Sequence, residues 1–85
     1  MSAKLEFSPR AARDLQGLDR KTVARIIQAL EEFVAFNRGD VKKLRGKTEE
    51  WRLRVGDYRV RFEQDAERLL VTVLKAAHRR EAYRD

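Results

Sequence analysis

Four arginines alternate with apolar residues in the stretch 51–62, which reads WRLRVGDYRVRF. This alternation has the period of a β-strand with one buried face. Gly56-Asp57 divides the stretch in two and suits a two-residue type II′ hairpin turn with glycine first. With that turn, the four arginines share one face of the hairpin in two directly opposed pairs, Arg54 with Arg59 and Arg52 with Arg61.

Such an arrangement indicates a ligand, because like charges directly opposite one another destabilise a sheet. Arginine binds phosphate through two parallel hydrogen bonds, so a polyanion is the expected ligand. Residues two apart on a strand lie about 7 Å apart, which would let Arg52 and Arg54 bind neighbouring phosphates. The alternative interpretation is a solvated face on which arginine serves solubility, with Glu50 and Glu63 partly neutralising one end.

The C-terminal sequence HRREAYRD offers further candidate residues. Arg79 and Arg80 would add positive charge to the same site, and Tyr83 could stack on a nucleobase or pack against the domain. His78 stands beside these arginines, which disfavour its protonated form, so a neutral imidazole could serve as a base. A lone histidine can equally be structural. Before the hairpin, three basic residues are either solvated charge or an extension of a phosphate track: Lys43, Arg45 and Lys47.

Composition narrows the class of protein. The chain has 85 residues, enough for a single domain over residues 1–85, and carries a net charge of +6. It has no cysteine and one histidine, so we expect neither a disulfide nor a metal site, and we expect no cofactor. No segment approaches the roughly 20 apolar residues that span a bilayer, so the expected location is the cytoplasm.

The elements that must position the arginines follow from local patterns. Residues 4–7 alternate as a short strand, Ser8-Pro9 begins a helix that ends at Gly17, and Asp19 begins a second helix that ends near Asn37. Residues 40–50 are expected to form a loop. Residues 68–77 read as an apolar strand buried on both faces. The predicted fold is therefore α+β with the order β-α-α-β-β-β: a small antiparallel sheet, two N-terminal helices packed on its apolar face, and the first strand beside the last.

The chain resembles the RelE/ParE toxin superfamily of type II toxin–antitoxin systems over essentially its whole length. The helical half from Phe7-Ser8-Pro9 onward fits, but the specific part is the C-terminal half. The matching elements there are Lys43-Leu44-Arg45-Gly46, the hairpin WRLRVGDYRV, the strand that ends in Leu74-Lys75, and the terminal His78-Arg79-Arg80-Glu81-x-Tyr83. The resemblance implies a RelE-like, microbial-RNase-like fold.

The RelE-like branch implies a ribosome-dependent mRNA endoribonuclease, an mRNA interferase that inhibits translation. In that branch a ribose 2′-OH attacks the adjacent phosphate of mRNA in the ribosomal A site. By this resemblance the catalytic set is Arg52, Arg54, Arg59, Arg79 and Tyr83. From their charge and place in the sequence, Arg61, Arg80 and the basic residues before the hairpin are expected to be RNA-binding residues. The first two positions are typically Lys in that branch. Because arginine stays protonated, the resemblance leaves the general base open, with His78 as a candidate.

Two alternatives remain within the resemblance: a ParE-like inhibitor of DNA gyrase, and a catalytically inactive homologue that only binds an antitoxin. The expected partners are a cognate antitoxin, with an acidic helical or extended segment, and the ribosome with mRNA in its A site. No membrane partner is expected.

Overall fold

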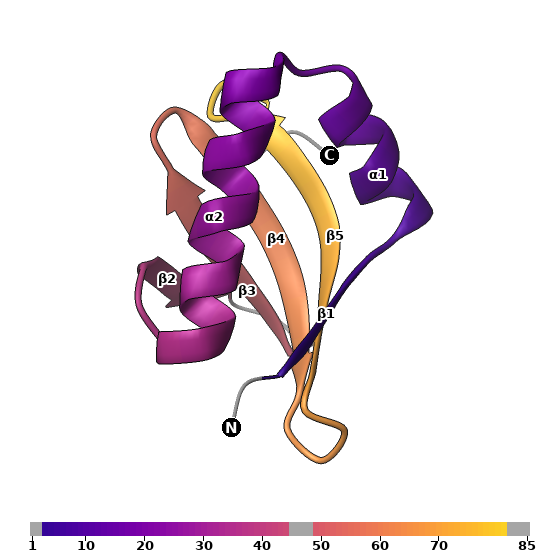
Figure 1. The fold of residues 1–85 in the computed structure, drawn as a ribbon, viewed down its shortest axis with the longest axis vertical. Coiled ribbons are helices and arrows are strands. Elements are labelled where there is room, and N and C mark those ends of the chain that lie inside the picture. The colour runs from indigo at the N-terminus through magenta and orange to yellow at the C-terminus, as the bar shows by residue number, and fades with distance from the viewer. Residues whose placement is uncertain (1–2, 45–48, 82–85) are drawn as a thin grey trace.

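The structure, a computed structural model, describes residues 3–44 and 49–81 of the chain (Figure 1). Its elements follow the order β1 (Lys4–Phe7), α1 (Pro9–Gln16), α2 (Arg20–Phe36), β2 (Asp40–Lys43), β3 (Glu50–Val55), β4 (Tyr58–Asp65) and β5 (Leu70–His78). The five strands form one sheet in the spatial order β1-β5-β4-β3-β2. Strands β2 to β5 pair antiparallel, and β1 lies beside β5 as predicted. Because β1 is parallel to β5, the sheet is mixed and not antiparallel throughout. The predicted α+β class is confirmed.

Strand β2 corrects the prediction for residues 40–50. That stretch was expected to be a loop, but Asp40–Lys43 pairs antiparallel with β3 and forms one edge of the sheet. Only Val41 in this strand is apolar, and it lies opposite the buried Leu53. A short edge strand with one apolar residue has too little alternation to be recognised from sequence.

Both helices begin and end where capping residues predict. The Ser8 hydroxyl accepts a hydrogen bond from the backbone N–H of Ala11, and the Asp19 carboxylate accepts one from that of Thr22. Helix α2 ends at Asn37, which adopts the left-handed conformation that favours Asn and Gly. The predicted helices are confirmed.

The core lies between the helices and one face of the sheet. In Figure 1, α2 crosses in front of β3 and β4, and α1 lies beside β5. The fully buried side chains come from both layers: Ala11, Ile26, Leu30, Leu53, Val60, Phe62 and Val73. The rings of Phe33 and Phe62 pack with centroids 5.1 Å apart, which joins α2 to the centre of the sheet.

The hairpin has the predicted register. Val55 lies opposite Tyr58, Arg54 opposite Arg59, and Arg52 opposite Arg61. Gly56 has a φ of +56° and Asp57 has no positive φ, which is the pattern of a type II′ turn. The sequence therefore predicted this turn and pairing correctly.

A β-bulge interrupts β5 and changes which side chains face the core. Arg61 pairs with Lys75 while Phe62 pairs with Val73, so Leu74 has no partner in β4. The buried residues of β5 are Val71 and Val73 before the bulge and Ala76 after it. Burial on both faces was therefore the wrong explanation for the continuous apolar run. The strand buries one face at a time, and the extra residue exchanges the two faces.

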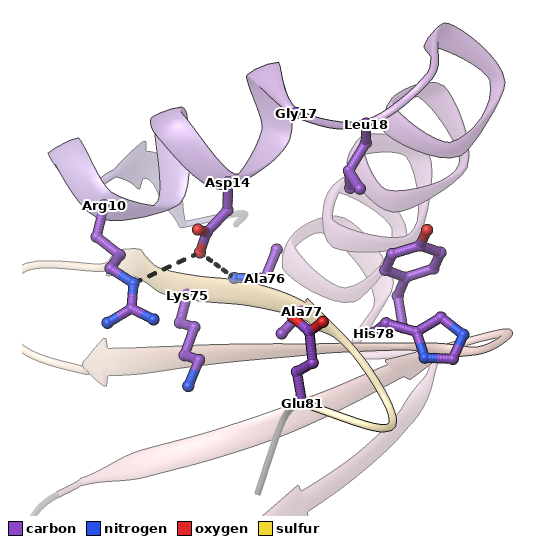
Figure 2. A pocket seen from close by; sticks show the side chains of 10 residues that line it. Arg10, Asp14, Gly17, Leu18, Lys75, Ala76, Ala77, His78 and Glu81 are labelled. Atoms are coloured by element: carbon purple, nitrogen blue, oxygen red, sulfur yellow. Dashed lines mark hydrogen bonds and ion pairs between the residues drawn. The ribbon is translucent and has the colours of Figure 1, made fainter. Parts of the chain in front are cut away.

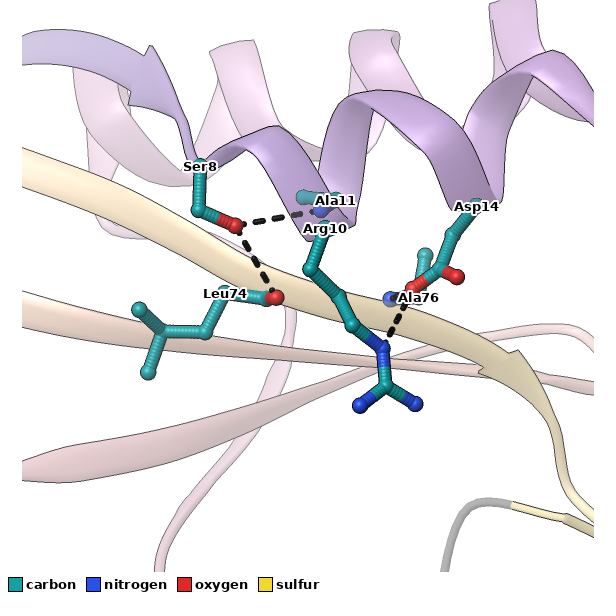
Figure 3. Close-up of polar contacts among 6 residues, drawn as sticks. All are labelled: Ser8, Arg10, Ala11, Asp14, Leu74 and Ala76. Carbon is teal, nitrogen blue, oxygen red and sulfur yellow. Dashed lines mark hydrogen bonds and ion pairs between the residues drawn. The ribbon is translucent and has the colours of Figure 1, made fainter.

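Helix α1 closes the edge of β5 that β1 leaves uncovered (Figure 3). The Ser8 hydroxyl donates a 3.1 Å hydrogen bond to the carbonyl of Leu74, and the Asp14 carboxylate accepts a 3.0 Å hydrogen bond from the N–H of Ala76. Side chains thus take the place of a neighbouring strand, which protects the edge from pairing with another chain.

Candidate nucleic-acid interface

The face of the sheet away from the core carries the four hairpin arginines. We call this surface, with Arg52, Arg54, Arg59 and Arg61, the arginine face. Arg54 and Arg59 form one opposed pair near the turn, and Arg52 and Arg61 form the next pair along the hairpin. The structure therefore brings together four of the residues that the sequence predicted to act on a polyanion.

Asp40, from the unforeseen strand β2, lies beside two of these arginines. Its carboxylate is 3.3 Å from Nε of Arg54 and 3.7 Å from an Nη of Arg52. Arg52 is 9% exposed and its guanidinium is therefore largely withdrawn from water. A buried charge is costly unless it is paired, so Asp40 stabilises Arg52 and orients both guanidinium groups.

The arginines on β4 are also held by local acceptors. An Nη of Arg59 donates 3.0 Å hydrogen bonds to the carbonyls of Gly56 and Tyr58, and an Nη of Arg61 lies 3.6 Å from the Glu50 carboxylate. The Nε atoms of Arg59 and Arg61 are buried and, within the described residues, have no hydrogen-bond partner. Because these Nε atoms are buried, a phosphate would bind the terminal Nη groups, and guanidinium groups that are held in place suit phosphate oxygens.

Arg79 joins the same end of the sheet through the hairpin turn. Its backbone N–H donates a 2.7 Å hydrogen bond to the carbonyl of Asp57, and its Nε lies 3.9 Å from the Asp57 carboxylate. The side chain is more than half exposed. Arg80 follows and is exposed. The predicted grouping of Arg79 with the hairpin is therefore supported by direct contacts to the turn.

The structure places His78 on the other side of the sheet. His78 lies opposite Tyr58, and the two rings contact each other edge to face with centroids 5.5 Å apart. Tyr58 packs against the hydrophobic core, so both rings lie on the helical side. Nδ1 of His78 accepts a 3.2 Å hydrogen bond from the backbone N–H of Arg80. The sheet therefore separates His78 from the arginine face, although His78 contacts the backbone of Arg80.

Lys43 is likewise not grouped with the arginines. It lies opposite Trp51, which alternates in β3 with the residues that face the helices. Its Nζ is 5.6 Å from the centre of the Trp51 ring. Nζ also lies 3.3 Å from the Glu49 carboxylate. The prediction that Lys43 extends the phosphate track is contradicted by this register. Three further predicted residues lie outside the described residues: Arg45, Lys47 and Tyr83.

Two lysines that sequence reasoning did not select lie on the arginine face. Lys42 is opposite Arg52, and Lys75 is opposite Arg61. Recognising them requires the pairing of β2 and the bulge in β5, neither of which has a clear sequence signal. Asp40 was missed for the same reason.

A cavity of about 580 Å³ lies between α1 and the end of β5 (Figure 2). Figure 2 shows Leu18 and His78 at one end of its lining and Arg10 at the other, and Tyr58, which contacts His78, also lines it. Figure 2 shows Lys75 pointing away from α1, and the register places it opposite Arg61. Arg10 lies 3.9 Å from the Asp14 carboxylate, which joins the cavity wall to the closed edge of β5.

Neither a metal site nor a membrane span is seen in the described part of the chain. Residues 3–44 and 49–81 contain no group of three or more potential metal ligands close enough to share an ion. Neither α1 nor α2 is long and apolar enough to cross a membrane.

Comparison with solved structures identifies the fold as that of RelE toxins. The toxin–antitoxin complex RelBE2 from Mycobacterium tuberculosis matches with a TM-score of 0.81 and 25% identity, over 92% of this chain and 99% of that one. The RelE–RelB complex from the archaeon Pyrococcus horikoshii matches with a TM-score of 0.80 and 24% identity, over 96% and 100%. The isolated Escherichia coli RelE toxin matches with a TM-score of 0.78 and 22% identity, over 91% and 84%.

The amino-acid sequence shows the family to which this chain belongs. Residues 5–83 match the family model described as the ParE toxin of type II toxin–antitoxin systems, parDE. The chain therefore belongs to the ParE toxin family, within the RelE/ParE superfamily. A comparison with curated proteins gave no match.

Proposed function

We propose that this toxin is a ribosome-dependent endoribonuclease that cleaves mRNA and so inhibits translation. The observation that carries the proposal is the arginine face, whose two directly opposed arginine pairs lie on the hairpin that Arg79 contacts at its turn. Such a concentration of cations costs the fold stability, and a phosphate ligand accounts for it.

The chemistry needs charge stabilisation on a phosphate. The ribose 2′-oxygen attacks the adjacent phosphorus, the bond to the 5′-oxygen breaks, and the products are a cyclic phosphate and a free 5′-OH. The 2′-OH proton leaves to a base or to water, and the 5′-oxygen takes up a proton. Arg54, Arg59 and Arg79 would stabilise the negative charge of the pentavalent intermediate, and donors held in this way are each worth about 10²–10³ in rate.

The general base is not supplied by the four arginines, because guanidinium groups remain protonated. His78 lies on the helical side of the sheet, which removes the reason for assigning it that role. Proton transfer to solvent or to a group on the ribosome is compatible with a toxin that needs the ribosome for activity.

A cognate antitoxin is the proposed regulatory partner. The relatives from M. tuberculosis and P. horikoshii were crystallised as toxin–antitoxin complexes. On this chain, Phe36 is 65% exposed at the end of α2, and β2 forms an edge of the sheet beside it. An amphipathic segment could cover Phe36, and the net charge of +6 favours an acidic one.

Mapping of mRNA ends tests the nuclease proposal. Primer extension on mRNA from cells that express the chain should show new 5′ ends inside translated frames. Arg79→Ala should abolish them, whereas Arg20→Ala, which removes an exposed arginine at the start of α2, should not. Growth arrest with intact mRNA would contradict the proposal.

The second candidate function is inhibition of DNA gyrase, which the match to the ParE family model favours. It predicts accumulation of cleaved DNA and induction of the DNA-damage response while mRNA stays intact. Measuring both responses in the same cells separates the two targets.

A further inference from the structure

The charges on the arginine face are arranged in rows that run across the strands. The register places four cations side by side on four neighbouring strands: Lys42 on β2, Arg52 on β3, Arg61 on β4 and Lys75 on β5. We call this set the cation row. Each neighbouring pair has the same sign of charge, so the row combines three unfavourable contacts in series.

The next row along the strands has the opposite sign. Glu50 lies opposite Glu63, Glu63 lies opposite Thr72, and Thr72 lies beside Glu6 of β1. We call these three glutamates the carboxylate row. An Nη of Arg61 lies 3.6 Å from the Glu50 carboxylate and so joins the two rows. On β3 and β4 the sheet therefore changes sign between adjacent rows, which lie about 7 Å apart along these strands.

This pattern restricts how a polyanion can lie on the sheet. A backbone that followed β3 would meet Glu50 as soon as it passed Arg52, and its phosphates would be repelled there. A backbone that crossed the strands would stay over positive charge for about 14 Å, the width of four strands, and could place more than one phosphate on the cation row.

We propose that a single-stranded nucleic acid crosses the strands along the cation row, with Lys42 and Lys75 contacting phosphates at its two ends and the carboxylate row limiting its footprint. The inference rests on the proposed nucleic-acid function. It changes the sequence-based expectation, in which Arg52 and Arg54 bind neighbouring phosphates along one strand.

A phosphate backbone fits this row better than an acidic protein segment does. Arg52 and Arg61 are held near Asp40 and Glu50 and so present fixed positions rather than flexible charge. Fixed guanidinium groups favour the phosphate geometry. The exposed Lys42 and the half-buried Lys75 then add positive charge at the ends.

Binding of an uncleavable probe tests the path. The probe is a short, fluorescently labelled oligouridylate with 2′-O-methyl groups, which cannot undergo attack by the 2′-oxygen. Lys42→Gln and Lys75→Gln should each weaken binding by about three- to tenfold and lower the slope of log affinity against log salt by about 0.7. The matched control is Lys43→Gln, the next exposed lysine on the same strand, whose side chain lies on the helical side. It should leave affinity and slope unchanged.

The limit that the carboxylate row sets on the nucleic-acid footprint is tested separately. Glu63→Gln should tighten binding of the same probe, because it removes repulsion beside the cation row, while Glu32→Gln on the exposed side of α2 should have no effect. Circular dichroism confirms that each variant is folded before binding is measured.

Several outcomes would overturn the path. Equal losses of affinity for Lys42→Gln and Lys43→Gln would do so, as would no binding of the probe by the wild type. Stronger binding of poly-glutamate that is weakened by the same two substitutions in the cation row would also do so, and would assign the row to an acidic protein segment. Row-dependent binding of the probe without mRNA cleavage in cells would support the path and contradict the nuclease. Cleavage without row-dependent binding would contradict the path alone.

Discussion

The carboxylate of Asp14 accepts a 3.0 Å hydrogen bond from the backbone N–H of Ala76, although the two residues are 62 positions apart in the chain. Asp14→Ala would leave this partly buried N–H without its partner, and we expect a loss of about 1–3 kcal/mol in the free energy of unfolding. Urea unfolding measures the loss, and faster hydrogen exchange at Ala76 locates it.

Arg10→Gln provides the control for this prediction. It removes the exposed ion pair with Asp14 but keeps the bond to the strand, so its effect should stay below about 1 kcal/mol. Equal effects of the two substitutions would show that the ion pair, and not the closure of the strand edge, is what stabilises α1.

The two faces of the sheet predict different outcomes for two candidate catalytic residues. Arg59→Gln should lower ribosome-dependent mRNA cleavage by about 10²–10³, because it removes a held donor from the arginine face. His78→Gln should leave the cleavage rate nearly unchanged, because its ring packs against Tyr58 on the helical side. Single-turnover cleavage on programmed ribosomes measures both, and a collapse of activity in His78→Gln would contradict the assignment of its side of the sheet.

Gly56 and Gly17 form a matched pair for testing the hairpin turn. Gly56 has a φ of +56°, so Gly56→Ala forces a side chain into the left-handed region and should cost about 1–2 kcal/mol. Gly17 ends α1 with a φ of −82° and has room for a methyl group, so Gly17→Ala should be neutral or stabilising by up to about 1 kcal/mol. Thermal unfolding of the two variants checks the sign of each change.

Asp19 gives a prediction for the dependence of stability on pH. The hydrogen bond from the Thr22 hydroxyl lowers the pKa of the Asp19 carboxyl, with further lowering from backbone N–H groups at the start of α2. Because the folded-state pKa lies below the unfolded one, the carboxylate stabilises the fold above the unfolded value of about 3.9. That stabilisation is lost as the pH falls through the folded-state value.

A comparison with Asp19→Asn isolates this contribution from the other carboxylates. The wild type should lose more stability than the variant when the pH is lowered from about 5 to about 2. Urea midpoints at both pH values provide the measurement, and parallel losses in the two proteins would contradict the role of the ionised cap.

The sequence predicts the hairpin and the helices well because each has a strong local signal. The alternation from Trp51 to Phe62 and the single Gly-Asp turn leave one register, and the structure has that register. Ser8, Asp19 and Asn37 mark the helix boundaries through their caps. The arginine pairs could therefore be derived by counting residues.

The parts of the site that the sequence did not predict depend on contacts between distant segments. Strand β2 has one apolar residue, so neither its pairing nor the approach of Asp40 to Arg54 has a local signal. In β5, apolar residues on both sides of Leu74 conceal the bulge, because the usual alternation is absent. For this reason the sequence could not show that Lys75 lies on the arginine face and that His78 does not.

The bulge at Leu74 makes the charge of the arginine face depend on the path of the backbone as well as on residue type. A regular strand with the same residues would continue the alternation set by Val71 and Val73. Lys75 and Ala77 would then turn toward the helices, and Ala76 and His78 would turn toward the arginines. Removal of Leu74 would instead give a regular strand that keeps Arg61 opposite Lys75, so the later residues would stay on their present faces. In alignments of this family, a gap at Leu74 should therefore not be treated as a change of active-surface chemistry.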